Sequence, residues 1–312
     1  MTIRELRANG IQSLSASSPS PELDADCLLQ YVLACDKTHI LFHRDDEVTP
    51  EQEAQFSSYI QARKTGLPIA YLTGTKEFFG YDFLVTPDVL IPKPDTELLI
   101  EKTLDAIKEK TSRKERILTI CDMCTGSGCV GLSILKACSD MNIVHQEFLP
   151  AITMADISDK ALDIARQNAE KLLSSTQKSK IKFVRTNLFQ MVNGTFDIIV
   201  SNPPYIPSEE AKALLQDGRS EPLLALDGDI DFMGNPTGEN DGLGIMRNLV
   251  PQAVEHLAPQ GILIVEAGEY NAEMTEYIFR KNGLSDTHIY KDLSGQLRDI
   301  SGIKNSTSSL FR

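Results

Sequence analysis

The spacing of hydrophobic residues divides the chain into parts with different periods. Up to about residue 70, apolar side chains recur at helical spacing, for example over 23–32. The stretch Thr49-Pro50-Glu51-Gln52 begins another helix, because it combines an N-cap, a proline at the first helical position and a capping-box glutamine. Residues 1–70 are therefore predicted to form an N-terminal helical domain.

A shorter period follows the helical part. Apolar side chains are dense over 77–85, and Gly80 lies where a tight turn is required. This pattern predicts a β-hairpin linker at 71–92. The linker runs into Ile91-Pro92-Lys93-Pro94-Asp95-Thr96-Glu97, which by itself indicates only an extended connection ending in a helix N-cap at Asp95 or Thr96.

From residue 117 onward, short apolar runs alternate with helical patterns, which is typical of an α/β domain with a mostly parallel sheet. We expect this domain to span 93–312. Its strands are predicted at 117–121, 152–156, 181–185, 196–200, 261–266, 288–291 and 299–303. Residues 207–245 interrupt the pattern, and their Asp, Gly, Pro and Asn content predicts a long irregular stretch. The tail from Asn305 is expected to fray.

Composition narrows the function classes. The chain has 312 residues, of which 41% are hydrophobic and 24% charged, and no apolar run approaches the length of a membrane span. We therefore expect a cytoplasmic protein without a membrane partner. The net charge of −13 argues against a broad nucleic-acid-binding surface. The six cysteines lack partner histidines at metal-ligand spacing, which favours reduced thiols and no metal site.

The strongest chemical signal is Asn202-Pro203-Pro204-Tyr205, directly after a buried apolar strand. Ligands of open α/β sheets bind at the carboxyl edge where this loop lies. The Asn202 side chain and the Pro203 carbonyl offer two acceptors for a planar NH2 group, and Tyr205 offers a flat face. We infer N-methylation of an amide or exocyclic amine, which needs no dedicated base because the alkylated cation is acidic. The alternative is a rigid strand exit with a turn-capping Asn.

A glycine-rich turn precedes this loop in the chain. Cys124-Thr125-Gly126-Ser127-Gly128 lies between a strand and a helix, where a ligand can approach the backbone closely. The next strand ends in Asp156, whose carboxylate can accept both ribose hydroxyls of a nucleoside. The third strand is followed by Leu188, where apolar side chains would close an adenine pocket. A nicotinamide enzyme is disfavoured, because Cys124 stands where its motif requires the first glycine.

Together these pieces resemble the class I S-adenosylmethionine-dependent methyltransferases, and more narrowly the peptide chain release factor glutamine methyltransferases. The resemblance covers nearly the whole chain. It rests on Gly74-Thr75-Lys76-Glu77-Phe78, on the 91–97 stretch, on Asn202 to Tyr205, and on Glu221-Pro222 with Ala225-Leu226-Asp227-Gly228. The Asn-Pro-Pro-Tyr motif alone is shared with adenine-N6 methyltransferases, so the 91–97 stretch is the discriminating one.

The resemblance implies a Rossmann-like seven-stranded methyltransferase sheet, with S-adenosyl-L-methionine as the cofactor. The implied partner is a class I release factor, recognised by residues 1–70 and methylated on the glutamine N5 of its Gly-Gly-Gln loop; the implied enzyme is a monomer without a nucleic-acid substrate. The resemblance implies the following site residues: catalytic Asn202, Pro203 and Tyr205; substrate-binding Asn202, Pro203, Pro204 and Tyr205; cofactor-binding Cys124, Thr125, Gly126, Ser127, Gly128, Asp156, Leu188 and Asn202.

Three departures from that family's pattern bear on the cofactor site. Cys124 replaces a glycine, Asn187 replaces an aspartate, and 230–240 resembles an insertion. Cys124 crowds the turn if its φ is positive. Cys124 and Asn187 support one rival function, a catalytically weak cofactor-binding protein that docks a partner. The other rival, an adenine-N6 methyltransferase acting on nucleic acid, rests on the shared Asn-Pro-Pro-Tyr motif.

Overall fold

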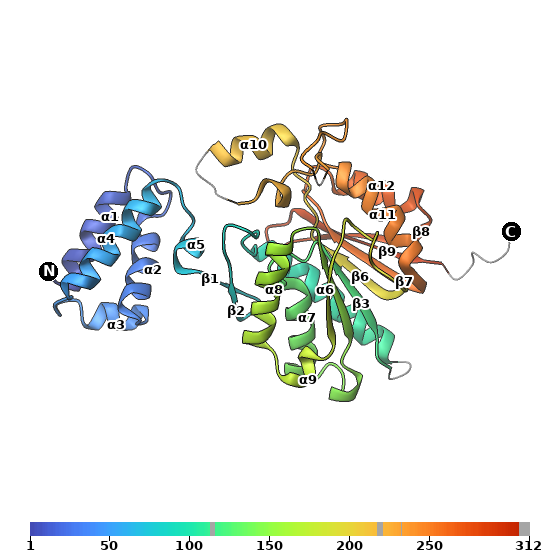
Figure 1. Cartoon of the computed structure of the whole chain (residues 1–312), viewed down its shortest axis with the longest axis horizontal. Helices are drawn as coiled ribbons and strands as arrows, with labels where there is room; N and C mark the ends of the chain where they lie inside the picture. Colours follow the sequence, from blue (N-terminus) through green and yellow to red (C-terminus); the bar gives the residue numbers. More distant parts are fainter. Residues whose placement is uncertain (113–115, 217–220, 232, 306–312) are drawn as a thin grey trace. The chain divides into compact units, whose positions relative to one another are not determined.

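The computed structural model describes residues 1–112, 116–216, 221–231 and 233–305 (Figure 1). The chain divides into two compact units, one of Met1–Thr75 with Ala213–Ser220 and one of Lys76–Lys212 with Glu221–Arg312. The tail predicted to fray lies outside the described residues after Asn305. No described helix is long and apolar enough to cross a membrane.

The first unit is helical, as predicted. Its helices are α1 (Ile3–Leu14), α2 (Pro21–Leu33), α3 (Lys37–Phe42), α4 (Pro50–Lys64) and α5 (Ile69–Thr73). Thr49 caps α4 as expected, because its hydroxyl accepts from the Gln52 N–H while the Gln52 side chain accepts from the Thr49 N–H. Buried side chains that include Leu6, Leu28 and Phe56 form the core of this unit.

The predicted hairpin is present as β1 (Thr75–Phe78) and β2 (Tyr81–Leu84). Phe79 and Gly80 form its two-residue turn with φ of 52° and 76°, the positive values that a tight hairpin turn requires. After it, the 3₁₀ helix η1 (Pro94–Thr96) leads into α6 (Glu97–Ser112). The side chain of Glu97 accepts a hydrogen bond of 2.9 Å from the Phe79 N–H, which ties the turn to α6.

The second unit is built on a seven-stranded sheet with the order β5-β4-β3-β6-β7-β9-β8. The strands are β3 (Thr119–Met123), β4 (Ala151–Asp156), β5 (Ile181–Arg185), β6 (Phe196–Ser201), β7 (Leu257–Glu266), β8 (Leu284–Lys291) and β9 (Leu297–Lys304). The pairs from β5 to β7 are parallel, and β9 is antiparallel to both of its neighbours. The predicted α/β fold with seven strands is confirmed.

Helices cover both faces of the sheet (Figure 1). One face packs against α6, α7 (Cys129–Asp140) and α8 (Asp159–Leu172), and the other against α11 (Gly244–His256) and α12 (Ala272–Lys281). Alternate strand residues enter the two cores, so Ile198 and Val200 face the first layer while Ile199 faces the second. The short η2 (Gln146–Phe148) and α9 (Ser175–Lys178) lie in the connections.

Two sequence predictions need correction. The first strand of the sheet begins two residues later than expected and extends to Met123, so Asp122 is a strand residue rather than part of the turn. Residues 207–245 are not wholly irregular, since they contain α10 (Ser208–Gln216), η3 (Leu223–Ala225) and the start of α11. The polar composition of the whole stretch concealed α10, whose first turn carries Glu209 and Glu210.

Candidate active site

The strand order places two predicted loops at one edge of the sheet. β3 and β6 are parallel neighbours, and the chain leaves β3 toward β4 on one side and β6 toward β7 on the other. This reversal is where open α/β sheets bind ligands. The glycine-rich turn follows β3 and Asn202 follows β6, so both lie at the carboxyl edge of this switch point.

Two hollows open at this edge, and every described residue that lines them belongs to the second unit. The larger has a volume of ≈ 180 Å³, and its lining includes Cys124, Thr125, Gly126, Ser127, Asp156, Leu188, Asn202 and Pro204. The smaller has a volume of ≈ 70 Å³ and is lined in part by Asn202, Pro203, Pro204 and Tyr205. Asn202 and Pro204 border both hollows. Of the predicted site residues, only Gly128 lines neither.

The turn after β3 has a left-handed backbone at three positions. Cys124, Gly126 and Gly128 have φ of 60°, 55° and 82°. A Cβ at Gly128 would lie 3.0 Å from Met154 Cε and 3.1 Å from Ala165 Cβ, so glycine is required there by both space and conformation. Gly128 therefore determines the conformation of the turn without lining either hollow. Cys124 adopts the conformation for which a glycine was expected.

A buried carboxyl fixes the same turn. Asp122 Oδ2 accepts from Thr125 Oγ1 at 2.5 Å and from the Gly131 N–H at 2.9 Å. Burial raises the pKa of Asp122 to about 7, although both hydrogen bonds oppose the rise. Sequence reasoning assigned Asp122 no role, because a strand-terminal Asp gives no sign of which N–H groups will reach it.

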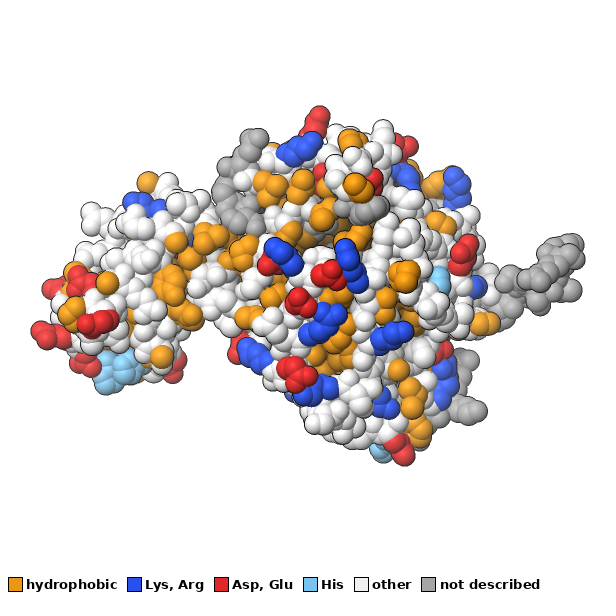
Figure 2. All heavy atoms as spheres, viewed as in Figure 1, with side chains coloured by type: hydrophobic (Ala, Val, Ile, Leu, Met, Phe, Trp, Pro, Cys, Tyr) orange, Lys and Arg blue, Asp and Glu red, His pale blue; other side chains and the backbone are white. Residues whose placement is uncertain are grey.

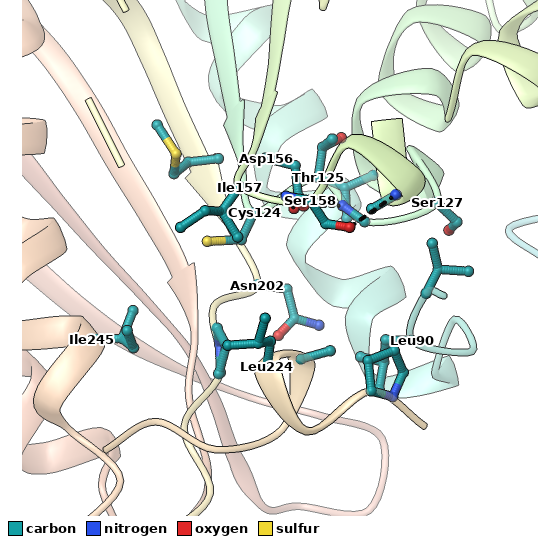
Figure 3. A pocket seen from close by; sticks show the side chains of 18 of the residues that line it. Leu90, Cys124, Thr125, Ser127, Asp156, Ile157, Ser158, Asn202, Leu224 and Ile245 are labelled. Carbon is teal, nitrogen blue, oxygen red and sulfur yellow. Dashed lines mark hydrogen bonds between the residues drawn. The ribbon is translucent and has the colours of Figure 1, made fainter. Parts of the chain in front are cut away.

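Asp156 closes the turn from the neighbouring strand. Its Oδ2 accepts from the Gly126 N–H and its Oδ1 from the Ser158 N–H, each at 2.9 Å (Figure 3). Burial raises the pKa of this carboxyl against those backbone hydrogen bonds. Because Asp156 also lines the larger hollow, it can hold the turn while presenting acceptor lone pairs to a ligand.

Asn202 is oriented by a residue of η1. Its Nδ2 donates to Thr96 Oγ1 at 3.0 Å, which fixes the side-chain amide. Its Oδ1 accepts no hydrogen bond from any described residue. Figure 3 shows the Asn202 side chain beside the hollow that Cys124 and Thr125 also border. The arrangement leaves one oriented acceptor at the junction of the two hollows.

Tyr205 is held at both its backbone and its ring. Its hydroxyl donates to Glu266 Oε1 at 3.0 Å, and its carbonyl accepts from Asn271 Nδ2 at 3.1 Å and Tyr270 OH at 3.2 Å. Burial and the neighbouring Glu266 charge raise the pKa of Tyr205, so the phenol stays protonated. Tyr205 can therefore present a fixed aromatic wall to the smaller hollow.

The 91–97 stretch is more than an N-capped linker, because each of its polar side chains contacts a distant segment. Lys93 Nζ lies 2.7 Å from Glu221 Oε1, and Asp95 Oδ2 lies 3.2 Å from Arg298 Nη2. Thr96 accepts from Asn202, and Glu97 accepts from the hairpin turn. These contacts with distant segments stabilise the site, and the local sequence pattern of 91–97 does not predict them.

The larger hollow also has lining residues that sequence reasoning did not predict. Ile230 and Asp231 come from the stretch expected to be an insertion, and Ile245 comes from α11. Asp231 folds this loop back by accepting from Asn235 and from the Met233 N–H, and Ile230 bridges to Pro236. Hydrophobic side chains gather near the middle of the second unit in Figure 2, with charged side chains around them.

Two family models match the chain. Residues 5–74 match the PrmC N-terminal domain, and residues 95–236 match the Methyltransferase small domain. The second match includes both the glycine-rich turn and the Asn202 loop.

Curated relatives match over nearly the whole chain. A release factor glutamine methyltransferase from Koribacter versatilis is 34% identical, covering 97% of this chain and 99% of the relative. Another from Bordetella pertussis is 33% identical, covering 94% of this chain and 98% of the relative. Among solved structures, a methyltransferase from Pyrococcus furiosus superposes with a TM-score of 0.47 at 21% identity, covering 74% of this chain and 92% of that chain.

Proposed function

The chain belongs to the family of release factor glutamine methyltransferases, and from this premise we propose that it methylates the side-chain amide nitrogen of the glutamine in a release factor's Gly-Gly-Gln loop. It is an enzyme of the methyltransferase class, with a full-length match to relatives of that name. The observation that carries the proposal is the oriented Asn202 carbonyl oxygen at the junction of the two hollows.

We assign the larger hollow to S-adenosyl-L-methionine, which supplies an electrophilic methyl group on a sulfonium. The residues fit such a ligand. Gly126 allows close backbone approach, Asp156 can accept ribose hydroxyls, and Leu188 offers an apolar wall for adenine. Thr125 and Ser127 complete the proposed lining beside Cys124, while Gly128 sets the shape of the turn.

We assign the smaller hollow to the glutamine side chain. Asn202 Oδ1 and the Pro203 carbonyl would accept from the two amide N–H groups, Pro204 would line the slot, and Tyr205 would pack against the amide plane. Holding the NH2 group through both hydrogens favours a nitrogen whose lone pair can attack in line. Catalysis then consists mainly of positioning and electrostatics.

The helical first unit is proposed to recognise the release factor. Its matched family model is distinct from the methyltransferase model, and neither hollow includes any of its described residues. We propose a monomer that acts in the cytoplasm on the protein factor itself. No direct nucleic-acid contact is part of the proposal, in line with the net charge of −13.

Radiolabel transfer from S-adenosylmethionine separates this function from its rivals. The acceptors are a purified release factor, its Gly-Gly-Gln→Gly-Gly-Ala variant as the matched control, and an adenine-rich duplex. We expect label on the unaltered factor alone. Label on the duplex would instead indicate an adenine-N6 methyltransferase. Cofactor binding without transfer to any acceptor would indicate a docking protein.

A further inference from the structure

Two buried carboxyl groups lie side by side behind the proposed glutamine slot. Glu266 ends β7 and Asp299 is its cross-strand partner on β9, so the two side chains share one face of the sheet. Their exposed fractions are 1% and 0%. Glu266 also lines the smaller hollow, together with Asn202 and Tyr205.

Most of the hydrogen-bonding capacity of this pair is unused. Glu266 Oε1 accepts from the Tyr205 hydroxyl, whereas Glu266 Oε2 and both Asp299 oxygens have no hydrogen-bond partner among the described residues. Unpaired buried carboxyl oxygens are costly and rare, so each requires an explanation. Two adjacent buried carboxyls cannot both ionise cheaply, which means that the pair retains a proton.

The charged and polar groups around the pair come from several elements. Thr96 and Asp95 of η1, Tyr205 of the Asn202 loop and Arg298 of β9 face Glu266, and Lys102 of α6 also acts on Asp299. Arg298 is shared with Asp292 at 3.0 Å and Asp95 at 3.2 Å. Burial raises the pKa of Glu266 and, together with the Glu266 charge, raises that of Asp299 well above its usual range. Because Glu266 accepts the Tyr205 hydroxyl hydrogen bond, which stabilises a charged carboxylate, we assign the negative charge to Glu266 and the proton to Asp299.

In place of the expectation from the sequence that no dedicated base is needed, we propose that Glu266 is the proton acceptor of the reaction. This inference rests on the proposed function of the site. As the bond from the methyl carbon to the amide nitrogen forms, the carbon–sulfur bond breaks and its electron pair stays on sulfur. In the same step the nitrogen gives one proton to the Glu266 carboxylate, which leaves a neutral N-methyl amide, a neutral thioether and a protonated carboxyl.

Glu266 is better suited to this step than its neighbours in the slot. The Asn202 and Pro203 carbonyls are neutral and weakly basic, whereas a carboxylate in a low-polarity site is a stronger base than one in water. Among the described residues that line the smaller hollow, Glu266 is the only one with a carboxylate, and its buried Oε2 has no hydrogen-bond partner among the described residues. The simpler alternative is that Glu266 merely anchors the Tyr205 hydroxyl.

Glu266→Gln separates these two roles, because glutamine keeps the size and an acceptor for Tyr205 but cannot take a proton. The measurement is the single-turnover rate of methyl transfer to the release factor across pH, at saturating cofactor. For the wild type we expect a rate that falls in acid as Glu266 becomes protonated. For Glu266→Gln we expect a rate about 10²-fold lower that no longer shows this acid limb.

Two matched variants complete the test. Tyr205→Phe removes only the anchored hydroxyl and Asp299→Asn only the second carboxyl, and both are expected to retain an acid limb. The inference would be overturned if Glu266→Gln kept the wild-type rate and pH profile. It would also be overturned if Tyr205→Phe lost as much rate as Glu266→Gln and no longer showed the fall in acid. Failure of the wild-type enzyme to methylate the factor would instead overturn the proposed function.

Discussion

Cys124 carries backbone strain at the centre of the proposed cofactor site. Its φ of 60° lies in the left-handed region, which costs a residue with a Cβ about 1 kcal/mol or more relative to glycine. Its side chain packs against the second hydrophobic core, and burial raises the pKa of the thiol, so the sulfur stays neutral. The crowding predicted from the sequence is therefore present, with partial compensation from packing.

Replacing Cys124 should reveal this strain. Cys124→Gly removes the strain and the side chain together, whereas the matched Cys124→Ala removes the sulfur but keeps the Cβ. We expect the glycine variant to be more stable than the alanine variant by about 1 kcal/mol in urea unfolding. Equal stabilities, or a more stable alanine variant, would show that the turn is not strained at this position.

At the residue scale, the sequence indicated candidate site residues that are close together in the chain. It gave no sign of residues that reach the site from distant segments. Asn202 and Tyr205 were identifiable because their motif follows a buried strand directly. Glu266 was not, because a terminal Glu on a strand is common, and its partner Tyr205 comes from a loop and its neighbour Asp299 from another strand.

At the scale of elements, Asn168 of α8 connects the hairpin to the glycine-rich turn. It is fully buried, and its amide donates to the Ser127 carbonyl at 2.9 Å and the Leu84 carbonyl at 3.0 Å. Its carbonyl accepts from the Leu84 N–H at 2.6 Å. One side chain therefore satisfies three backbone groups from two elements, which explains how β2 supports the site.

Asn168→Leu should destabilise the protein by about 2–4 kcal/mol, because it leaves those three backbone groups without their side-chain partner. Cofactor affinity should fall as well, since the Ser127 carbonyl is released. Urea unfolding and cofactor titration measure the two effects. Gln167→Leu is the control on the same helix, where an exposed side chain makes only a local bond, and a similar loss there would contradict the role of Asn168.

The elements themselves were largely predictable. The buried strand β6 stands out as an apolar run with β-branched residues, and it ends at Ser201, one residue beyond the predicted end. α10 was missed because its apolar positions are diluted by a polar segment. The contacts of residues 91–97 with Glu221 and Arg298 could not be predicted from local sequence patterns either, because both partners are distant in the chain.

At the scale of the whole molecule, the two units have separate proposed tasks. Within the described part of the chain, the residues that line the two hollows all belong to the second unit. The first unit is helical and has its own hydrophobic core. The task that we propose for it is recognition of the release factor. A net charge of −13 over the chain is compatible with a protein acceptor and unfavourable for a nucleic-acid backbone.

The central claim is that Asn202 positions the accepting amide. The most direct test is the single-turnover rate of Asn202→Ala at saturating cofactor and release factor, beside Asn187→Ala as the same change elsewhere in the larger hollow. We predict a fall of about 10²–10³-fold for Asn202→Ala, with the fold and cofactor binding retained, and little change for Asn187→Ala once cofactor is saturating. An unchanged rate in Asn202→Ala would contradict the account.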